Sequence, residues 1–273
     1  MKDILIKEIK VNDYLTVSKL PGADYVINPY VGCSHACKYC YASFMKRFTG
    51  HEEAWGTFLD VKRCDKEVDI NKLKNKTVFL SSVTDCYNPL EEKYEITRNI
   101  LKQLIKADCL VNIATKSKLI LRDLNLIKSL KKVIVSVSIN TLDENFRTDM
   151  DNASSIEERL EVLKKLHKNG IYTVLFMSPM FPYLTDWQAL IKKTSEYVSE
   201  FWFENLNLRG DYKYSILNYI KAKHFNYYDE YIKIYVKNDK EYWQNLSKEI
   251  EIYCQENKIK YQNYFHHEEI VKK

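Results

Sequence analysis

NPYVGCSHACKYCYA, residues 28–42, holds three cysteines within eight positions, Cys33, Cys37 and Cys40, in the spacing C-x3-C-x2-C. The chain has seven cysteines, and the other four are scattered without a pairing pattern: Cys64, Cys86, Cys109 and Cys254. Clustered cysteines in an intracellular chain more often bind metal or take part in chemistry than form a disulfide framework. The stretch therefore predicts a metal centre. The surrounding sequence indicates the fold in which this centre lies.

The overall composition favours a globular intracellular protein. The chain has 273 residues, is 45% hydrophobic and carries a formal net charge of +5. These values allow a sizeable core and lack the concentrated basic footprint of a dedicated nucleic-acid binder. No apolar run approaches the roughly 18 to 20 residues that span a bilayer, and residues 1–10 alternate charges with isoleucines, unlike a signal peptide. We therefore expect a cytoplasmic protein that does not enter a membrane.

The sequence on both sides of the cysteines alternates short β-rich runs with helical patterns. Pro89 suits the first turn of a helix. A second predicted helix, near residues 154–170, begins at a serine and ends at Gly170, and a third has Thr185 or Asp186 as its cap. Strict alternation predicts a parallel sheet with right-handed crossovers. Six units are too few for a closed eight-stranded barrel, so we predict an α/β fold, a partial (β/α)6 TIM-like barrel with functional residues at the carboxyl ends of its strands. The predicted strands are 24–31, 77–82, 110–116, 133–139, 171–180 and 201–208.

The last part of the chain differs in composition. Residues 211–273 are rich in tyrosine and lysine, which predicts a helical extension whose tyrosines lie half-buried against the barrel, although interleaved aromatics and lysines can also stack bases. We assign residues 1–210 to the barrel domain. Three other segments are weaker candidates for functional residues. HHEE at 266–269 is expected to face solvent, and Arg122 is expected to pair locally with Asp123. Arg209-Gly210 is expected to lie where a substrate could touch it.

Three thiols rather than four restrict the kind of metal centre. A structural zinc site needs four ligands, and His35 is the candidate for the fourth, but it lies between two of the cysteines in a tight loop. A [4Fe–4S] cluster has four iron corners, so three thiolates leave one iron open to bind and reduce something. The cluster is the favoured interpretation and zinc with His35 is the alternative.

C-x3-C-x2-C with an aromatic residue, here Tyr39, just before the third cysteine resembles the signature of the radical S-adenosylmethionine (radical SAM) enzymes. The resemblance implies a [4Fe–4S] cluster on Cys33, Cys37 and Cys40 after the first strand, with SAM on the open iron. It also implies reductive cleavage of SAM to methionine and a 5′-deoxyadenosyl radical, which abstracts hydrogen from a substrate.

Blocks between Asp24 and Trp187 narrow the resemblance to the spore photoproduct lyase-like branch. In order, they are DYVINPYVGCSHACKYCYA, SSVTDCYNPLEEKYEITRNIL, IATKSKLILRD, VSVSINT and SPMFPYLTDW. Those lyases carry a hydrogen-donating cysteine on the second strand, and this chain has Ser82 there. Photoproduct repair is therefore not expected. Cys86, just beyond, is either a substitute hydrogen donor or a small buried hydrophobic residue.

The same resemblance assigns a SAM pocket residue by residue. Lys116, at the end of the third predicted strand, corresponds to the lysine that binds the SAM carboxylate, and Ser138 to its hydroxyl partner. Thr84 and Asp85 stand where the family places acceptors for the ammonium and ribose. Tyr39 and the backbone of the cluster loop are suited to flank the adenine.

We therefore expect a radical SAM enzyme, lyase-like or transferase-like, that works with a flavodoxin-type or ferredoxin-type reductant protein. Its substrate is open among nucleic acid, peptide and small molecule, and the oligomeric state is not predicted. The alternatives are an iron–sulfur electron-transfer or structural subunit without SAM chemistry, and a zinc-binding interaction protein.

Overall fold

An eight-stranded sheet forms the centre of the structure, a computed structural model that describes residues 4–265. Its strand order is β11-β10-β9-β8-β7-β6-β3-β2, and every neighbouring pair is parallel except β2 and β3. The strands are β2 (Leu15–Val17), β3 (Tyr25–Ile27), β6 (Lys76–Leu80), β7 (Cys109–Thr115), β8 (Lys132–Ser138), β9 (Tyr172–Met180), β10 (Glu200–Asn205) and β11 (Tyr261–Asn263).

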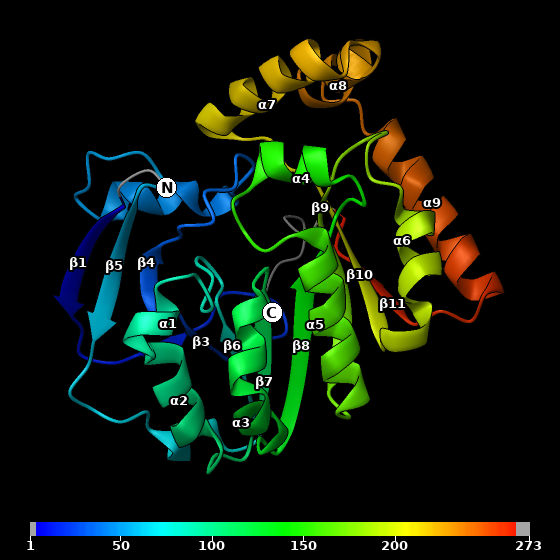
Figure 1. Cartoon of the computed structure of the whole chain (residues 1–273). Helices are drawn as coiled ribbons and strands as arrows, with labels where there is room; N and C mark the ends of the chain where they lie inside the picture. The colour runs from blue at the N-terminus through cyan, green and yellow to red at the C-terminus, as the bar shows by residue number, and fades with distance from the viewer. Residues whose placement is uncertain (1–3, 266–273) are drawn as a thin grey trace.

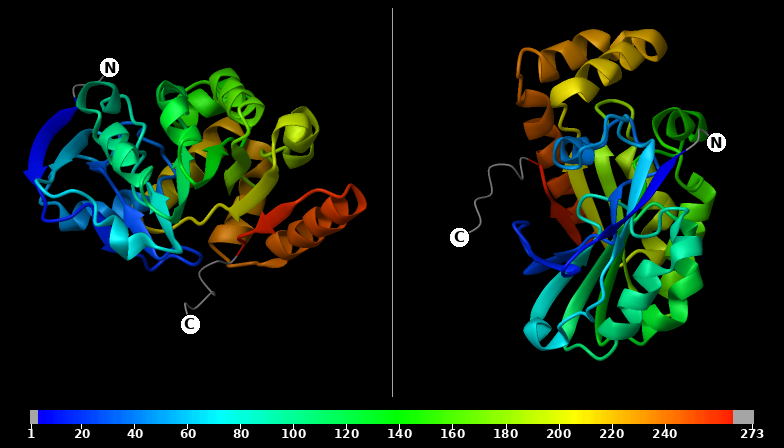
Figure 2. Two further views of the ribbon diagram at one scale, coloured as in Figure 1. Left: turned by 90° about the horizontal axis from the view of Figure 1, so that it is seen from below. Right: turned by 90° about the vertical axis from the view of Figure 1, so that its left-hand side faces the viewer.

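Helices connect the strands from β6 to β10 and lie along the outer side of the curved sheet (Figures 1 and 2). The expected helix stops and caps are present, since Ser155 forms a capping box with Glu158, Asp186 accepts from Ala189 N, and Gly170 has φ +76°. The predicted (β/α)6 partial barrel is confirmed. The helices are α1 (Glu91–Tyr94), α2 (Ile96–Leu104), α3 (Leu124–Lys128), α4 (Glu144–Met150), α5 (Ile156–Lys168) and α6 (Trp187–Thr194), with 3₁₀-helices η1 (Tyr41–Phe48), η2 (Ile70–Leu73), η3 (Lys118–Asp123) and η4 (Ser195–Tyr197).

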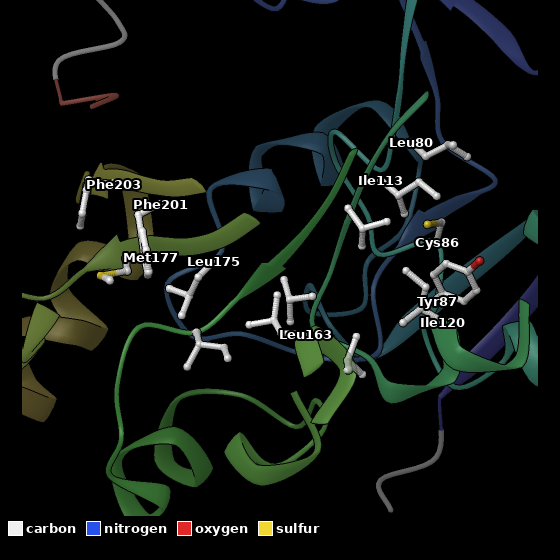
Figure 3. Close-up of a cluster of buried hydrophobic side chains, with 14 of the residues drawn as sticks. Leu80, Cys86, Tyr87, Ile113, Ile120, Leu163, Leu175, Met177, Phe201 and Phe203 are labelled. Atoms are coloured by element: carbon white, nitrogen blue, oxygen red, sulfur yellow. The ribbon is translucent and has the colours of Figure 1, made fainter. Parts of the chain in front are cut away.

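The two faces of the sheet are buried to different degrees. On the outer face, Leu80, Ile113 and Leu175 are fully buried in the core beneath the helices (Figure 3). Along β7 the burial alternates residue by residue, so that inward-facing Asn112 and Ala114 stay partly exposed. We expected strands covered on both faces, and this holds for the second half of β8 and for most of β10, whereas β7 stays partly exposed on its inner face.

The first predicted strand, 24–31, is in fact two strands in different sheets. The chain bends at Asn28-Pro29, so that β3 joins the large sheet and β4 (Tyr30–Gly32) joins a three-stranded sheet in the order β1-β5-β4. In this small sheet, β1 (Leu5–Lys10) runs parallel to β5 (Phe58–Arg63). Proline cannot donate to a ladder, which explains why one strand ends before it and another begins after it.

The C-terminal extension is helical, as expected, and it also returns to the sheet. Its helices are α7 (Gly210–Lys223), α8 (Tyr228–Tyr235) and α9 (Glu241–Glu256), with the short η5 (Phe225–Tyr227). Helices α7 and α8 lie above the carboxyl ends of the strands (Figure 1). After α9, strand β11 pairs in parallel with β10, so the extension contributes a strand that the sequence did not predict. In residues 4–265, no helix is long and apolar enough to cross a membrane.

Candidate cofactor site

The three clustered cysteines lie on the loop between β4 and η1, at the carboxyl ends of the parallel strands. Cys33, Cys37 and Cys40 are free and partly exposed. Burial raises the pKa of all three thiols, that of Cys37 to about 12. The charges of Cys37 and Cys40 also raise the pKa of Cys33, so the thiols lie within electrostatic range of one another. A metal centre bound here would have to displace the thiol protons, because the thiolate is the form that binds metal.

The backbone of this loop is packed tightly against the segment before β5. Ala36 has φ +48°, and a Cβ added at Gly56 would lie 2.7 Å from the Ala36 Cβ. A Cβ added at Gly32 would lie 2.5 Å from the Phe58 carbonyl oxygen. Both glycines also have positive φ. The close approach of two backbones fixes the loop's shape, and only glycine fits at these two positions.

The donor set suits an iron–sulfur cluster. Three soft thiolates are the ligands that such clusters take, and the Ser34 hydroxyl between the first two is buried without a hydrogen-bond partner in the described chain. His35, the fourth ligand of the zinc alternative, instead has its Nδ1 3.4 Å from Asp85 Oδ2. Among residues 4–265, no three His, Cys, Asp or Glu side chains form a group that could hold a single metal ion.

Lys116 supplies a cation beside the thiols. It follows β7 directly, and its Nζ lies 5.9 Å from the centre of the Tyr39 ring. After burial, which dominates, the charge of Lys116 is the next largest influence on the pKa of Cys37, and it acts to lower that pKa. The ammonium forms no hydrogen bond or ion pair with any described residue. It is therefore available to an anionic group of a ligand.

Asp85 fixes the backbone of this region rather than standing free. Its carboxylate is 7% exposed and accepts hydrogen bonds from Tyr87 N at 2.9 Å, Thr115 Oγ1 at 2.8 Å and Lys116 N at 2.8 Å. Together with the contact to His35, these bonds engage both carboxylate oxygens. Asp85 thus joins the loop after β6 to the end of β7 and positions Lys116.

Thr84 and Ser138 complete the set named from the sequence. The Thr84 hydroxyl donates to the Gly32 carbonyl at 2.5 Å and so ties the loop after β6 to the cysteine loop. Ser138 is the last residue of β8 and is 7% exposed. Because Thr115 pairs with Val137 in the parallel register, Lys116 and Ser138 follow at the same level of the sheet.

Tyr39 points into a buried polar network that the sequence did not reveal. Its hydroxyl donates to Asp151 Oδ2 at 3.1 Å, and Asp151 Oδ1 accepts from Arg159 Nη2 at 2.6 Å. Arg159 is 1% exposed and also donates to the Ser138 carbonyl at 3.2 Å. In the sequence, the only sign that Arg159 is buried is its position four residues before Leu163, on the apolar face of its helix.

The segment around Asp151 also holds the cysteine loop through its backbone. Lys38 N donates to the Met150 carbonyl at 2.9 Å, and Asn152 N donates to the His35 carbonyl at 2.8 Å. The loop after α4 therefore holds the cysteine loop at His35 and Lys38.

Cys86 does not line the site. It is fully buried, burial raises the pKa of its thiol, and it packs with Leu80 and Ile113 in the outer core (Figure 3). Its backbone is held by Ser81 Oγ, which accepts from Cys86 N at 2.6 Å. The structure thus supports the small buried hydrophobic residue and not the hydrogen donor. Ser82 is instead near the cysteine loop, since its carbonyl accepts from the Tyr41 hydroxyl.

The remaining candidates lie elsewhere. Arg122 pairs with Asp123 at 2.7 Å, as expected, and also with the buried Glu91 at 2.8 Å. Arg209 precedes α7 and its Nε donates to Asn207 Oδ1. The HHEE segment at 266–269 is outside the described residues.

Comparison with protein families gives one long match. The family model for the Radical SAM superfamily matches residues 27–192. An uncharacterized protein of Methanocaldococcus jannaschii is 40% identical over 208 residues, which cover 76% of this chain and 80% of that protein. An uncharacterized protein of Acidianus two-tailed virus is 34% identical over 171 residues, covering 58% of this chain and 56% of that protein.

Solved structures share the fold at low sequence identity. A spore photoproduct lyase variant with bound AdoMet and dinucleoside spore photoproduct has a TM-score of 0.59 and 15% identity, over 78% of this chain and 65% of that one. Streptococcus suis SuiB bound to S-adenosylmethionine has a TM-score of 0.56 and 12% identity, over 88% of this chain and 49% of that one. The chain thus spans about two thirds of the lyase and about half of SuiB, and the likeness concerns the fold alone.

Proposed function

Because the chain belongs to the radical SAM superfamily, we propose that Cys33, Cys37 and Cys40 hold a [4Fe–4S] cluster and that the protein is an enzyme that binds SAM at its open iron. The observation that carries this proposal is the position of three partly exposed free thiols beside Lys116, whose ammonium contacts the Tyr39 ring but forms no hydrogen bond or ion pair with a described residue. The cluster and SAM, when bound, supply reductive cleavage to a 5′-deoxyadenosyl radical for hydrogen abstraction.

The chain's own residues hold and orient the cofactor in this proposal. Lys116 binds the SAM carboxylate, with the Ser138 hydroxyl at the same level of the sheet as a second donor. Asp85 acts as a positioning residue, because it accepts a hydrogen bond from Lys116 N and so fixes the backbone from which the lysine side chain extends. Thr84 holds the loop after β6 against the cysteine loop and accepts from the ammonium or ribose. Tyr39, held by Asp151, flanks the adenine.

The proposed reaction is not repair of spore photoproduct. The strand-two position that carries the donor cysteine in the resembling lyases is Ser82 here, and Cys86 is buried in the core. The class, lyase-like or transferase-like, therefore stays open in this proposal. A flavodoxin-type or ferredoxin-type protein is the proposed electron source. Available reduced thiols suit the cytoplasm, which is the proposed location.

Anaerobic reconstitution tests the proposal. Protein loaded with iron and sulfide is assayed for iron content, visible absorption and, with a strong reductant and SAM, formation of 5′-deoxyadenosine. We expect a bound cluster and SAM cleavage. A bound cluster that never cleaves SAM would support the electron-transfer alternative, whereas retention of zinc alone would contradict both.

A further inference from the structure

Two arginines, one on each neighbouring helix, shape the segment between α4 and α5. Arg147 of α4 donates from Nη1 to the carbonyls of Asp151 at 3.1 Å and Ala153 at 3.2 Å. Arg159 of α5 donates from Nε to the Ser154 carbonyl at 2.8 Å. Because a guanidinium presents its donors in a rigid planar fork, these bonds fix the path of a segment that has no helix or strand of its own.

Arg159 lies at the centre of this arrangement. Its side chain and that of Asp151 are each 1% exposed. Asp151 Oδ1 accepts from Arg159 Nη2 at 2.6 Å and from Ala153 N at 3.0 Å. This leaves Oδ2 for the Tyr39 hydroxyl, which donates to it at 3.1 Å. Arg159 Nη1 donates to the Ser138 carbonyl at 3.2 Å, so each of the three guanidinium nitrogens bonds to a different group.

Stability alone does not explain a buried ion pair at this place. Removing two charges from water is costly, and replacing a buried pair by packed apolar side chains is often neutral or stabilising. The rest of the buried face of α5 is apolar, with Ile156, Leu160, Val162, Leu163 and Leu166. What an apolar side chain could not do at position 159 is hold polar groups of other segments in a fixed geometry. The identity of those groups therefore indicates the purpose of the arginine.

In the proposed function, the two groups that Arg159 holds serve different parts of one ligand. Tyr39 flanks the adenine, whereas the Ser138 hydroxyl joins Lys116 at the carboxylate. Lys116 and Ser138 are at the same level of the sheet, and Lys116 Nζ lies 5.9 Å from the centre of the Tyr39 ring. Arg159 is thus bonded directly to the residue on the carboxylate side, and through Asp151 to the residue on the adenine side.

The Tyr39 ring is held from two directions. Its hydroxyl donates to Asp151, and its ring packs edge-on against Phe181 with 5.5 Å between the ring centres. The backbone on either side of Asp151 also bonds to the cysteine loop, at His35 and Lys38. A shift of Asp151 would therefore move the ring and the loop together. Such supporting contacts are what hold a binding group in its productive position.

We propose that Arg159 is a positioning residue of the cofactor pocket, acting through Asp151 on Tyr39 and directly on Ser138. The inference rests on the proposed function and adds to it a residue that does not itself touch the ligand. One buried guanidinium sets the spacing between the adenine side and the carboxylate side, because its planar fork fixes both bonds at once.

Calorimetric titration of anaerobic, cluster-loaded protein with two ligands tests this role. S-adenosylhomocysteine carries both adenine and carboxylate, whereas 5′-methylthioadenosine carries the adenine alone. Tyr39→Phe keeps the ring but removes the hydroxyl, and should weaken both ligands by about threefold to tenfold, as the loss of one hydrogen bond implies. Arg159→Met should weaken 5′-methylthioadenosine to the same extent. It should weaken S-adenosylhomocysteine by at least about threefold more, because Ser138 is released as well.

A double variant and a control separate positioning from general destabilisation. Tyr39→Phe added to Arg159→Met should cause no further loss of 5′-methylthioadenosine affinity, because the two residues act in one chain of contacts. Arg122→Met is the matched control, since Arg122 pairs with the buried carboxylates of Glu91 and Asp123. It should lower the unfolding midpoint and leave both affinities unchanged.

Arg159→Lys separates the two contacts and covers the case in which Arg159→Met does not fold. A lysine keeps the charge beside Asp151 but lacks the fork that also reaches the Ser138 carbonyl. This variant should bind 5′-methylthioadenosine with nearly wild-type affinity. It should bind S-adenosylhomocysteine at least about threefold more weakly than the wild type does.

Three outcomes overturn the inference: wild-type affinity for both ligands in either Arg159 variant, additive losses in the double variant, or a similar loss of affinity in Arg122→Met. Iron content and the unfolding midpoint are measured on the same samples. Wild-type protein that keeps its iron but binds neither ligand contradicts the proposed function. Wild-type binding that the Arg159 variants leave intact contradicts this inference alone.

Discussion

Asp85 accepts the backbone N–H of Lys116 at 2.8 Å, and this bond joins the loop after β6 to the end of β7. The same carboxylate accepts from Thr115 and Tyr87, so one buried side chain satisfies three donors. The lysine that faces the cysteines therefore starts from a fixed backbone position, although its own ammonium is unpaired in the described chain.

Replacing Asp85 with alanine should destabilise the protein by at least about 3 kcal/mol, because three buried donors lose their acceptor at about 1 to 3 kcal/mol each. Denaturant unfolding under anaerobic, reducing conditions measures the change. Asp65→Ala, which removes an exposed carboxylate paired with Lys10, is the control and should leave the unfolding midpoint nearly unchanged. A midpoint shift no larger than that of the control would show that Asp85 does not have this role.

Lys116→Ala should weaken SAM binding by about 1.5 to 3 kcal/mol, the usual worth of a hydrogen bond to a charged group. Iron content should not change, because the lysine is not a cluster ligand in our proposal. Titration calorimetry of cluster-loaded protein provides the dissociation constant. Lys118→Ala removes a nearby exposed lysine that pairs with Glu158, and serves as the matched control. An unaltered SAM dissociation constant in Lys116→Ala contradicts the assignment.

Alanine at any of Cys33, Cys37 or Cys40 should sharply reduce the iron that the protein retains after reconstitution, because two thiolates are a poor ligand set for the cluster. Cys64→Ala and Cys86→Ala should retain wild-type iron. Iron and sulfide analysis after desalting distinguishes the two groups. Wild-type iron in the triple variant would refute the central claim.

Gly56→Ala should disturb the cysteine loop, because the new Cβ would lie 2.7 Å from the Ala36 Cβ. Gly50→Ala is a matched control: Gly50 also has positive φ, but its Cβ would meet nothing within 4 Å. Both changes carry backbone strain of about 1 to 2 kcal/mol. Overpacking should cost Gly56→Ala about 1 to 3 kcal/mol more, together with lower iron retention. Equal stability and iron in the two variants would show that the loop can move away.

Incubation of reduced, cluster-loaded protein with SAM and dinucleoside spore photoproduct should yield no efficient conversion to thymines, because Ser82 cannot return a hydrogen atom and Cys86 is buried. Chromatography of the reaction mixture measures the product. Conversion at or above one turnover would overturn this prediction, and its loss in Cys86→Ala would identify Cys86 as the donor.

Local patterns were enough to predict parallel strands at β3 and β6 to β10, although the first prediction, 24–31, also took in β4, and to place Lys116 and Ser138 at strand ends. They failed where partners are distant in sequence. Strands β1 and β5 pair across about 50 residues, from Leu5 to Phe58, and neither has a local turn signal that announces the other. The Asp151–Arg159 pair was missed because burial of an ion pair depends on what packs over it. The core position of Cys86 likewise depends on how the chain turns after β6.

The sheet has two ends, β2 and β11, which do not pair with each other in the described chain. A closed barrel can admit a long polymer only if one end of the polymer is threaded into it. A barrel whose edge strands do not pair can instead receive an internal stretch sideways, with the polymer continuing in both directions. If the ligand is a polymer, this architecture would allow a residue far from either of its ends to reach the inner face of the sheet without the polymer having to be cut or threaded.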